Sequence, residues 1–168
     1  AVVGSKELIA QIFMRKVHFG AAPDPHSCYL LERGMRTLDV RMPRICENAH
    51  LLAQRLEAHD AIERVYHSKL ESHPDYEVAQ RILPHGSGMV AFVVKGGDEA
   101  ALAFMRKLNI IYEATSLGGV ESLIEHPGRM THASAAGSPL EVPADLVRLS
   151  VGIEDAEDLV TDLDKALR

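Results

Sequence analysis

Apolar residues recur at two different spacings along the chain, and the change between them predicts where long helices give way to a mixed domain. Helical spacing covers residues 6–19 and residues 25–59. From residue 62 onward, short runs rich in β-branched residues alternate with brief helical stretches and turn signals. We therefore expect a helical part in residues 1–59 and a small α+β domain in residues 60–168.

The two N-terminal helices are bounded by residues that cap or stop helices. Ser5 and Asp24 suit the N-cap position, and Gly20 suits the stop between the two helices. Gly34 and Pro43 interrupt the second pattern, so we expect either a bent helix or two successive helices. A helical stretch of this length in a short chain is typical of a connection between domains or of a contact with a partner subunit.

The small domain is predicted to hold about four strands in a mostly antiparallel sheet, with helices packed on one face. The predicted strands lie at residues 62–66, 88–94, 110–114 and 147–151. The predicted helices lie at residues 73–83, 98–108 and 120–124, and from residue 155 to the end. Residues 130–143 are rich in Ala, Ser, Gly and Pro and read as the least regular segment.

The chain begins with residues 1–4, Ala-Val-Val-Gly, which read like the end of a buried strand. A short apolar strand is a poor start for an independent domain, because its neighbours must come from elsewhere. We therefore expect the chain to be a piece of a longer protein.

Candidate chemistry is concentrated in a glycine turn and in the last predicted strand. In the turn, Ser116 precedes a glycine pair, so the backbone can bend sharply and its N–H groups stay open to a ligand. In the strand, alternation places Arg148 and Ser150 together on the less apolar face. A planar guanidinium beside such a turn suits bidentate binding of a carboxylate. The alternative is a structural Arg148, either exposed or paired with Glu154 or Asp155.

Other polar residues near the turn give weaker signals. His126 and His132 have no Asp or Cys at ligand spacing and do not predict a metal site. Glu121 and Glu125 would share one helical face, which is more typical of capping or salt bridges than of catalysis. Ser122 lacks the strand-to-helix elbow of a hydrolase nucleophile.

Three ordered motifs give the chain a resemblance to a known enzyme family. They are SLGGVESLIEHP at residues 116–127, MTHAS at residues 130–134 and VRLSVGIED at residues 147–155. In this order and at this spacing they resemble the cystathionine γ-synthase, cystathionine γ-lyase and methionine γ-lyase family. These are the pyridoxal-phosphate (PLP) enzymes of Cys and Met metabolism, and the resemblance covers nearly the whole chain.

The resemblance implies the C-terminal part of a fold-type-I PLP-dependent transferase. Residues 1–59 would hold the end of its large domain and the long interdomain helix, and residues 60–168 its C-terminal small domain. The intact enzyme would act on sulfur-containing or O-acylated homoserine-type amino acids, by C–S lysis or by γ-replacement. It would be a homo-oligomer, usually a tetramer in this family.

The resemblance also implies roles for residues of the turn and the strand. Arg148 matches the arginine that binds the α-carboxylate of the amino-acid substrate, Ser116 assists it, and Thr115 and Leu117 fall beside the substrate pocket. Some family members carry a discriminating Glu where this chain has Thr115, and Glu113 does not occupy that position. The choice between β-elimination, γ-elimination and γ-replacement therefore stays open.

One feature that the family needs is absent from the sequence. PLP chemistry requires a lysine that forms a Schiff base with the cofactor, and in this family it belongs to a Ser-x-x-Lys-Tyr segment in the large domain. None of the six lysines has that context: Lys6, Lys16, Lys69, Lys95, Lys107 and Lys165. We therefore expect no catalytic residue in this chain, PLP in the intact enzyme only, and an isolated chain that is inactive.

Charge, hydropathy and cysteine content argue against several other classes of protein. The net charge of −6 argues against a nucleic-acid partner, which favours a basic face. No apolar run approaches the length of a membrane span, and the first residues lack a signal-peptide pattern, so we expect a cytoplasmic protein. Cys28 and Cys46 are too few and too far apart for a disulfide framework or a zinc cluster.

Two alternatives to the enzyme hypothesis stay open. The chain could be a stand-alone α+β binding or oligomerisation module that kept the small-domain fold and lost catalysis, or an unrelated ferredoxin-like domain. A reading frame that continues upstream through Ser-x-x-Lys favours the enzyme, whereas a start codon just before Ala1 favours the module.

Overall fold

The computed structural model describes residues 2–135, 137–139 and 141–168, and the chain divides into two compact units. Unit 1 is Ala1–Asp39 and unit 2 is Val40–Arg168. Residues 2–4 carry no regular secondary structure, so the strand expected at the start of the chain is not seen there. Ala1, the first residue of that expected strand, lies outside the described residues.

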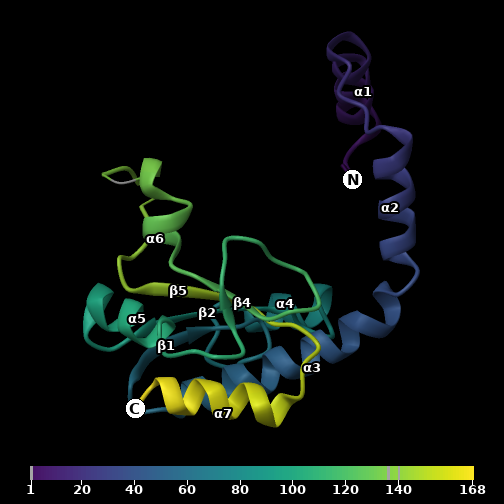
Figure 1. Ribbon diagram of the computed structural model, residues 1–168. Coiled ribbons are helices and arrows are strands. Elements are labelled where there is room, and N and C mark those ends of the chain that lie inside the picture. The colour runs from purple at the N-terminus through teal and green to yellow at the C-terminus, as the bar shows by residue number, and fades with distance from the viewer. Residues whose placement is uncertain (1, 136, 140) are drawn as a thin grey trace. The chain divides into compact units, whose positions relative to one another are not determined.

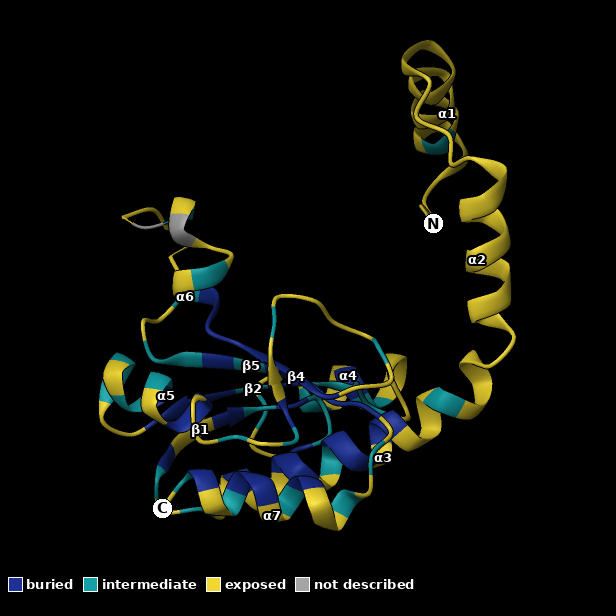
Figure 2. Cartoon of the chain, in the orientation of Figure 1, coloured by how far each residue is buried: buried dark blue, intermediate teal, exposed yellow. Residues whose placement is uncertain are grey.

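Unit 1 consists of helix α1 (Lys6–Phe19) and helix α2 (Pro25–Met35), as shown in Figure 1. The side chains of Ser5 and Asp24 cap the two helices, and Gly20 ends α1 in the left-handed conformation with φ of 69°. These predicted caps and the predicted stop are confirmed. Neither helix holds a buried residue, and every residue of α1 and α2 except the half-buried Ile9 is exposed (Figure 2).

Helix α3 (Leu38–Glu57) begins after a break at residues 36 and 37, so of the two predicted outcomes the structure has two successive helices. Pro43 lies inside α3 and does not end it. The buried residues of α3 recur at helical spacing: Ile45, Cys46, Asn48, Ala49, Leu52, Ala53 and Leu56. Most of α3 therefore packs as part of unit 2, and the division between units falls upstream of the domain boundary expected at residue 59.

Unit 2 is built on a mixed five-stranded sheet with the strand order β1-β2-β5-β4-β3. The strands are β1 (Ile62–Tyr66), β2 (Met89–Val94), β3 (Tyr112–Glu113), β4 (Leu123–Glu125) and β5 (Leu146–Ser150). Neighbouring strands pair antiparallel, except that β3 and β4 are parallel. The sheet has one strand more than the four or so that were predicted, and its pairing is mostly antiparallel, with one parallel pair.

The additional strand is β4, which lies where a short helix was predicted at residues 120–124. A short apolar run fits either a strand or a buried helix, because it is too brief to show a period. Pairing decides the outcome here: Leu123 lies opposite Ser150, and Ile124 lies opposite Leu149, on β5. Tertiary contact with β5 therefore overrides the local pattern.

The core of unit 2 lies between one face of the sheet and three helices. Helix α3, helix α5 (Gly97–Met105) and helix α7 (Ala156–Ala166) contribute buried apolar residues to it, and α3 and α7 run beneath the sheet in Figure 1. Phe92 of β2 meets Phe104 of α5 edge to face, with ring centroids 5.9 Å apart. Truncation of a fully buried Phe of this kind costs about 3–5 kcal/mol.

The remaining helical segments are short. Helix α4 (Tyr76–Ile82) follows β1, and helix α6 (Pro127–Met130) with the 3-10 turn η1 (Ala133–Ala135) follows β4. Helix α6 lies on the side of the sheet opposite α3 and α7 in Figure 1. Helices thus cover mainly one face, and the other face of β4 and β5 carries the polar residues Glu125, Arg148 and Ser150 beside the buried Leu123.

Candidate carboxylate-binding site

Arg148 lies in the middle of the polar face of the sheet. On β5 it pairs across to Ala91 of β2 on one side and to Glu125 of β4 on the other. Its neighbours Val147 and Leu149 are fully buried in the core, so the predicted alternation along this strand is confirmed. The side chain of Arg148 is 23% exposed, which leaves the guanidinium accessible from solvent.

The guanidinium of Arg148 is held on two sides by protein oxygens. Its Nη1 atom lies 3.0 Å from Oε1 of Glu125. Its Nη2 atom donates to the carbonyl oxygen of Thr115 at 3.0 Å and makes a longer contact of 3.5 Å with that of Ser116. The structure therefore brings Arg148 and the glycine turn together. The ion pair of Arg148 is with Glu125 and not with the residues that follow β5.

The contacts of Arg148 leave donor capacity at the outer end of its guanidinium. A guanidinium carries five N–H groups, of which Nη1 and Nη2 hold two each. Glu125 takes one N–H of Nη1, and Thr115 takes one N–H of Nη2. The 3.5 Å contact with Ser116 is at the limit of a hydrogen bond. By this count each terminal nitrogen keeps one N–H, and a carboxylate that reaches both would bind bidentately. The Nε atom of Arg148 is buried and has no hydrogen-bond partner among the described residues.

The glycine turn is anchored to the strand that carries Arg148. Gly118 has φ of 75°, a conformation that favours glycine, and its N–H donates to the Ser150 hydroxyl at 2.9 Å. Thr115, Ser116 and Leu117 precede this anchor and are exposed. The predicted site residues thus form one exposed bend beside the guanidinium.

A second network fixes the base of the turn through Glu154. The carboxylate of Glu154 accepts from the N–H of Ser122 at 2.5 Å and from its hydroxyl at 2.9 Å. The Ser122 hydroxyl accepts from the N–H of Gly152 at 2.9 Å. Asn48 of α3 donates to the carbonyl oxygens of Gly152 and Glu154, at 3.2 and 3.0 Å. Ser122 therefore has a structural role, which agrees with its lack of a nucleophile elbow.

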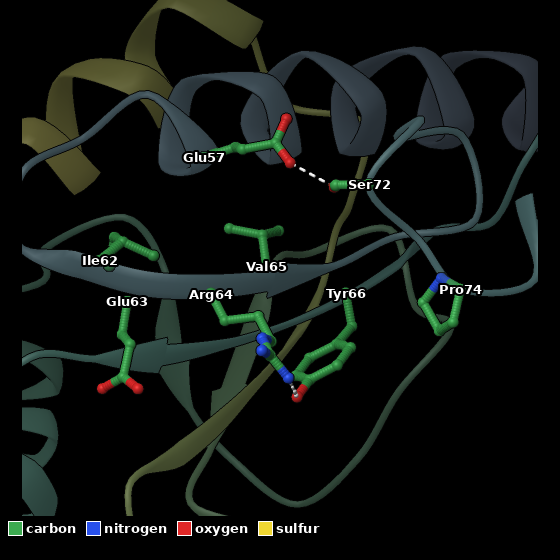
Figure 3. A pocket seen from close by; sticks show the side chains of 8 residues that line it. All are labelled: Glu57, Ile62, Glu63, Arg64, Val65, Tyr66, Ser72 and Pro74. Carbon is green, nitrogen blue, oxygen red and sulfur yellow. Dashed lines mark hydrogen bonds between the residues drawn. The ribbon is translucent and has the colours of Figure 1, made fainter.

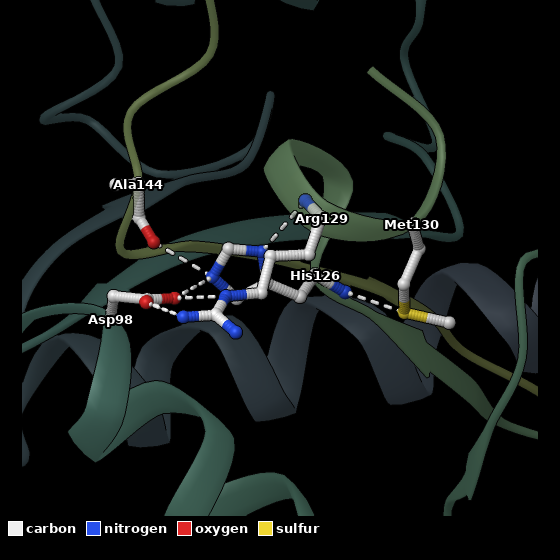
Figure 4. Close-up of polar contacts among 5 residues, drawn as sticks. All are labelled: Asp98, His126, Arg129, Met130 and Ala144. Atoms are coloured by element: carbon white, nitrogen blue, oxygen red, sulfur yellow. Dashed lines mark hydrogen bonds and ion pairs between the residues drawn. The ribbon is translucent and has the colours of Figure 1, made fainter. Parts of the chain in front are cut away.

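His126 lies directly after Glu125 and is buried in a polar cluster at the start of α6 (Figure 4). Its Nε2 atom lies 2.9 Å from Oδ1 of Asp98 and 2.7 Å from the carbonyl oxygen of Ala144. Its Nδ1 atom accepts from the N–H of Arg129 at 3.3 Å, and the Arg129 guanidinium pairs with Asp98. That arginine holds the pKa of Asp98 below its usual value by donating hydrogen bonds to the carboxylate.

His126 is therefore a satisfied structural histidine. Among the described residues, no group of three or more His, Cys, Asp or Glu side chains is arranged to hold a metal ion.

A separate pocket of about 470 Å³ lies along β1, the edge strand of the sheet (Figure 3). Four of its polar side chains bond to one another in pairs: Ser72 donates to Glu57, and Arg64 donates to Tyr66 at 3.4 Å. Its lining holds none of the predicted site residues: Glu57, Ile62, Glu63, Arg64, Val65, Tyr66, Ser72 and Pro74. The pocket is concave, but its lining does not direct several free polar groups at one ligand. Arg148 therefore remains the candidate site.

The groups around Arg148 fit a carboxylate and do not fit the covalent attachment of PLP. They are one guanidinium, backbone carbonyl oxygens and exposed hydroxyls, whereas attachment requires a lysine amine. Lys69 and Lys95 donate to the carbonyl oxygens of Pro84 and Asp60. In the described part of the chain, no lysine amine makes a hydrogen bond or ion pair with Arg148, Glu125 or the turn. No step of cofactor chemistry is therefore assigned to this chain.

Two residues of the site were missed by sequence reasoning or given another role. Glu125 was interpreted as a helix-surface carboxylate, but it is a fully buried strand residue that pairs with Arg148. The position of Glu125 directly after the apolar pair Leu123 and Ile124 could have indicated a buried strand residue. Ser150 was predicted correctly to share a face with Arg148. Its hydrogen bond with Gly118 could not be predicted, because it depends on the folded arrangement of the turn.

Known proteins match this chain over nearly its whole length. A family model described as Cys/Met metabolism PLP-dependent enzyme matches residues 1–168. A cystathionine γ-synthase from Mycobacterium tuberculosis is 48% identical over 99% of this chain and 43% of its own length. A cystathionine γ-lyase from Sus scrofa is 43% identical over 99% of this chain and 42% of its own.

A solved structure gives the same result for the fold. The crystal structure of MetB from Corynebacterium glutamicum matches with a TM-score of 0.93 and 44% identity, over 99% of this chain and 43% of that one. The chain thus spans less than half the length of the relatives that it matches. In the described residues, no helix combines the length and apolar character needed to cross a bilayer. The chain belongs to the Cys/Met metabolism family of PLP-dependent enzymes.

Proposed function

We propose that this chain supplies the substrate α-carboxylate site of a PLP-dependent trans-sulfuration enzyme. The enzyme would act on sulfur-containing or O-acylated homoserine-type amino acids, by C–S lysis or by γ-replacement. The observation that carries the proposal is the position of the Arg148 guanidinium, which is anchored to the bend at Thr115 and Ser116 on a side chain that is 23% exposed. Its five N–H groups outnumber these contacts, so donors are left for a ligand. Bound PLP would supply the electron withdrawal that stabilises charge at the substrate's α-carbon.

Electrostatics favours a substrate carboxylate at Arg148 even though Glu125 already pairs with it. At an effective dielectric constant of about 20, a carboxylate about 4 Å from the guanidinium gains about 4 kcal/mol, whereas repulsion from a second carboxylate about 6 Å away costs about 3 kcal/mol. Charge-assisted hydrogen bonds from the terminal N–H groups add to this balance. The attraction therefore exceeds the repulsion.

The chain's own contribution to the reaction is orientation. A carboxylate held at two points fixes the direction of the substrate's α-carbon, and correct placement of reacting groups is worth several kcal/mol of an enzyme's barrier. The exposed bend at Ser116 would place its hydroxyl beside the same carboxylate. Thr115 and Leu117 would then face the rest of the substrate.

The domain organisation, the location and the oligomeric state of the protein are also proposals. We infer that the chain is the part of the enzyme that carries the carboxylate motif, with residues 1–59 linking to a large domain and residues 60–168 forming a small domain, because that motif is present and Ser-x-x-Lys-Tyr is not. A cytoplasmic location and a tetramer are part of the same proposal. Exposed apolar residues on α1 and α2, such as Phe13 and Phe19, support contact with further polypeptide.

The test of the site is the kinetics of Arg148→Ala and Arg148→Lys in the intact enzyme. Loss of a bidentate charged contact worth about 2–4 kcal/mol lowers kcat/KM by about 30-fold to 1000-fold. KM rises, and kcat falls as well because the α-carbon loses its alignment. Lys keeps the charge without the planar fork, so Arg148→Lys recovers only part of the activity. A value of kcat/KM within a few-fold of wild type in Arg148→Ala would show that the assignment is wrong.

The isolated chain tests whether the lysine that binds PLP lies outside it. Mixed with PLP and reduced with borohydride, it is expected to form no stable adduct on any specific lysine. One labelled lysine, identified by peptide mass spectrometry, would contradict the proposal that the cofactor lysine lies elsewhere in the protein.

A further inference from the structure

We propose that Glu125 is a positioning residue for substrate recognition, which holds the Arg148 guanidinium in the orientation that receives a carboxylate. This inference rests on the proposed function of Arg148 and adds a residue that acts through it. Glu125 lies directly opposite Arg148 on the neighbouring strand, and its Oε1 atom is 3.0 Å from Nη1.

Glu125 is a buried carboxylate whose principal partner is Arg148. Its side chain is completely buried, whereas that of Arg148 is 23% exposed. A buried carboxylate is strongly disfavoured unless it is paired and hydrogen-bonded. Its Oε1 atom receives the Arg148 contact and a long contact of 3.4 Å from the Thr131 hydroxyl, and its Oε2 atom has no partner among the described residues. Arg148 is therefore the main compensation for this charge.

The pair fixes a side chain that would otherwise be mobile. A free arginine side chain samples many rotamers, and ordering it on substrate binding costs entropy. Glu125 holds one terminal nitrogen, and the Thr115 carbonyl oxygen holds the other. With both terminal nitrogens anchored, the outer N–H groups keep one orientation before the substrate arrives. That is preorganisation of the binding group by a supporting residue.

Glu125 is itself held in place by the cluster at the start of α6 (Figure 4). His126, the next residue, bridges Asp98 at the start of α5 and the carbonyl oxygen of Ala144 just before β5. The Arg129 guanidinium pairs with the same Asp98. This cluster ties the end of β4 to two other segments of unit 2, so the backbone of Glu125 has little freedom to move away from β5.

Two other roles for Glu125 predict different results. If Glu125 only stabilised the fold, its removal would lower all activities together, whatever the substrate carries at its α-carbon. If it mainly competed with the substrate carboxylate, its neutralisation would strengthen substrate binding. A positioning role instead predicts weaker recognition of the carboxylate and little change for a substrate that lacks one.

The experiment compares an amino-acid substrate with its α-carboxamide in the intact holoenzyme. The variants are Glu125→Gln, which keeps the size and removes the charge, and Glu125→Asp, which keeps the charge and shortens the reach. Arg148→Ala is the reference for complete loss of carboxylate recognition. Glu63→Gln, the same change at an exposed carboxylate on the distant edge strand β1, is the matched control.

We expect Glu125→Gln to lower kcat/KM for the acid by about tenfold or more, while that for the amide changes by less than about threefold. The acid-to-amide ratio then falls toward that of Arg148→Ala. Glu125→Asp gives a smaller decrease, and Glu63→Gln leaves the ratio unchanged. Dissociation constants for an unreactive acid and its amide, measured by calorimetry, follow the same order.

The controls separate failure of this inference from failure of the proposed function. If Arg148→Ala collapses the acid-to-amide ratio and Glu125→Gln does not, Glu125 has no positioning role. A higher ratio in Glu125→Gln also overturns the inference. If Arg148→Ala itself leaves the ratio unchanged, the proposed function fails first. Should Glu125→Gln not fold, Glu125→Asp decides, since an unchanged ratio there contradicts the inference.

Discussion

The N–H of Gly118 donates to the hydroxyl of Ser150 at 2.9 Å, which joins the glycine turn to the strand of Arg148 across 32 residues of sequence. Ser150 lies two positions after Arg148, on the same face of β5. One strand thus carries both the cation and the anchor of the bend beside it. The distance between guanidinium and turn is set by this strand.

Removal of the Ser150 hydroxyl should loosen the turn without disrupting the core. Ser150→Ala loses one hydrogen bond, at a cost of about 1 kcal/mol in the free energy of unfolding. Because the bend then samples other positions, we expect KM for the amino-acid substrate to rise about 3-fold to 10-fold in the intact enzyme. Steady-state kinetics and thermal unfolding measure the two effects.

Ser68→Ala is the matched control for that variant. The Ser68 hydroxyl is buried and has no hydrogen-bond partner in the described structure. Its removal should therefore leave KM unchanged and should not lower the free energy of unfolding. Equal effects of Ser68→Ala and Ser150→Ala would show that the anchor bond does not position the turn.

Gly152 is required where the chain leaves β5. A Cβ atom on Gly152 would lie 2.2 Å from the carbonyl oxygen of Val120 and 2.5 Å from Oε2 of Glu154. Because the first contact is with backbone, Gly152→Ala should destabilise the fold by about 1–3 kcal/mol or more. Thermal denaturation measures the loss.

A second glycine shows that the effect is steric. A Cβ atom on Gly34 of α2 would meet no atom within 4 Å. Gly34→Ala should therefore be neutral or stabilising by up to about 1 kcal/mol, since Ala favours a helix. A Gly152→Ala variant as stable as Gly34→Ala would contradict the close approach of Val120 and Gly152.

Stability should also depend on the protonation of His67. Its ring is 2% exposed, Nε2 lies 3.0 Å from the carbonyl oxygen of Ser87, and Nδ1 accepts from the N–H of Lys69 at 3.3 Å. Burial lowers the pKa of His67 below its ordinary value of 6.5, and the Ser87 carbonyl opposes this only in part. The neutral ring is therefore the form that the folded state prefers.

The sign of the pH effect follows from that preference. Below pH 6.5 the unfolded chain binds more protons at His67 than the folded chain does, so stability is complete above this pH and decreases as the pH falls. The melting temperature should drop between pH 7.5 and 5.5, and His67→Gln should reduce the drop. His132→Gln, at an exposed position, is the control. An identical pH profile for His67→Gln and wild type would contradict the prediction.

The sequence predicted those parts of the fold that depend on local pattern. The caps at Ser5 and Asp24 and the stop at Gly20 follow from the chemistry of single residues, and the alternation along β5 placed Arg148 on the polar face. These features need no knowledge of distant segments. Family motifs then added the expected role of Arg148, which local pattern alone left open.

Features that depend on pairing between distant segments were not predicted. β4 has only three residues, so no period marks it as a strand, and its pairing with β5 decides its structure. Glu125 was misinterpreted for that reason, since its partner lies on β5. The contact of Asp98 with Arg129 likewise joins segments 31 residues apart. Such pairs become visible only when the sheet order is known.

The central claim is that Arg148 receives the α-carboxylate of an amino-acid substrate. Its most direct test is a crystal structure of the intact enzyme with an unreactive amino-acid ligand, in which the distances from the ligand carboxylate to Nη1 and Nη2 of Arg148 are measured. The account predicts two contacts of about 2.7–2.9 Å, with the guanidinium still paired to Glu125. A ligand carboxylate held by other residues, with Arg148 more than about 5 Å away and beyond hydrogen-bonding range, would contradict it.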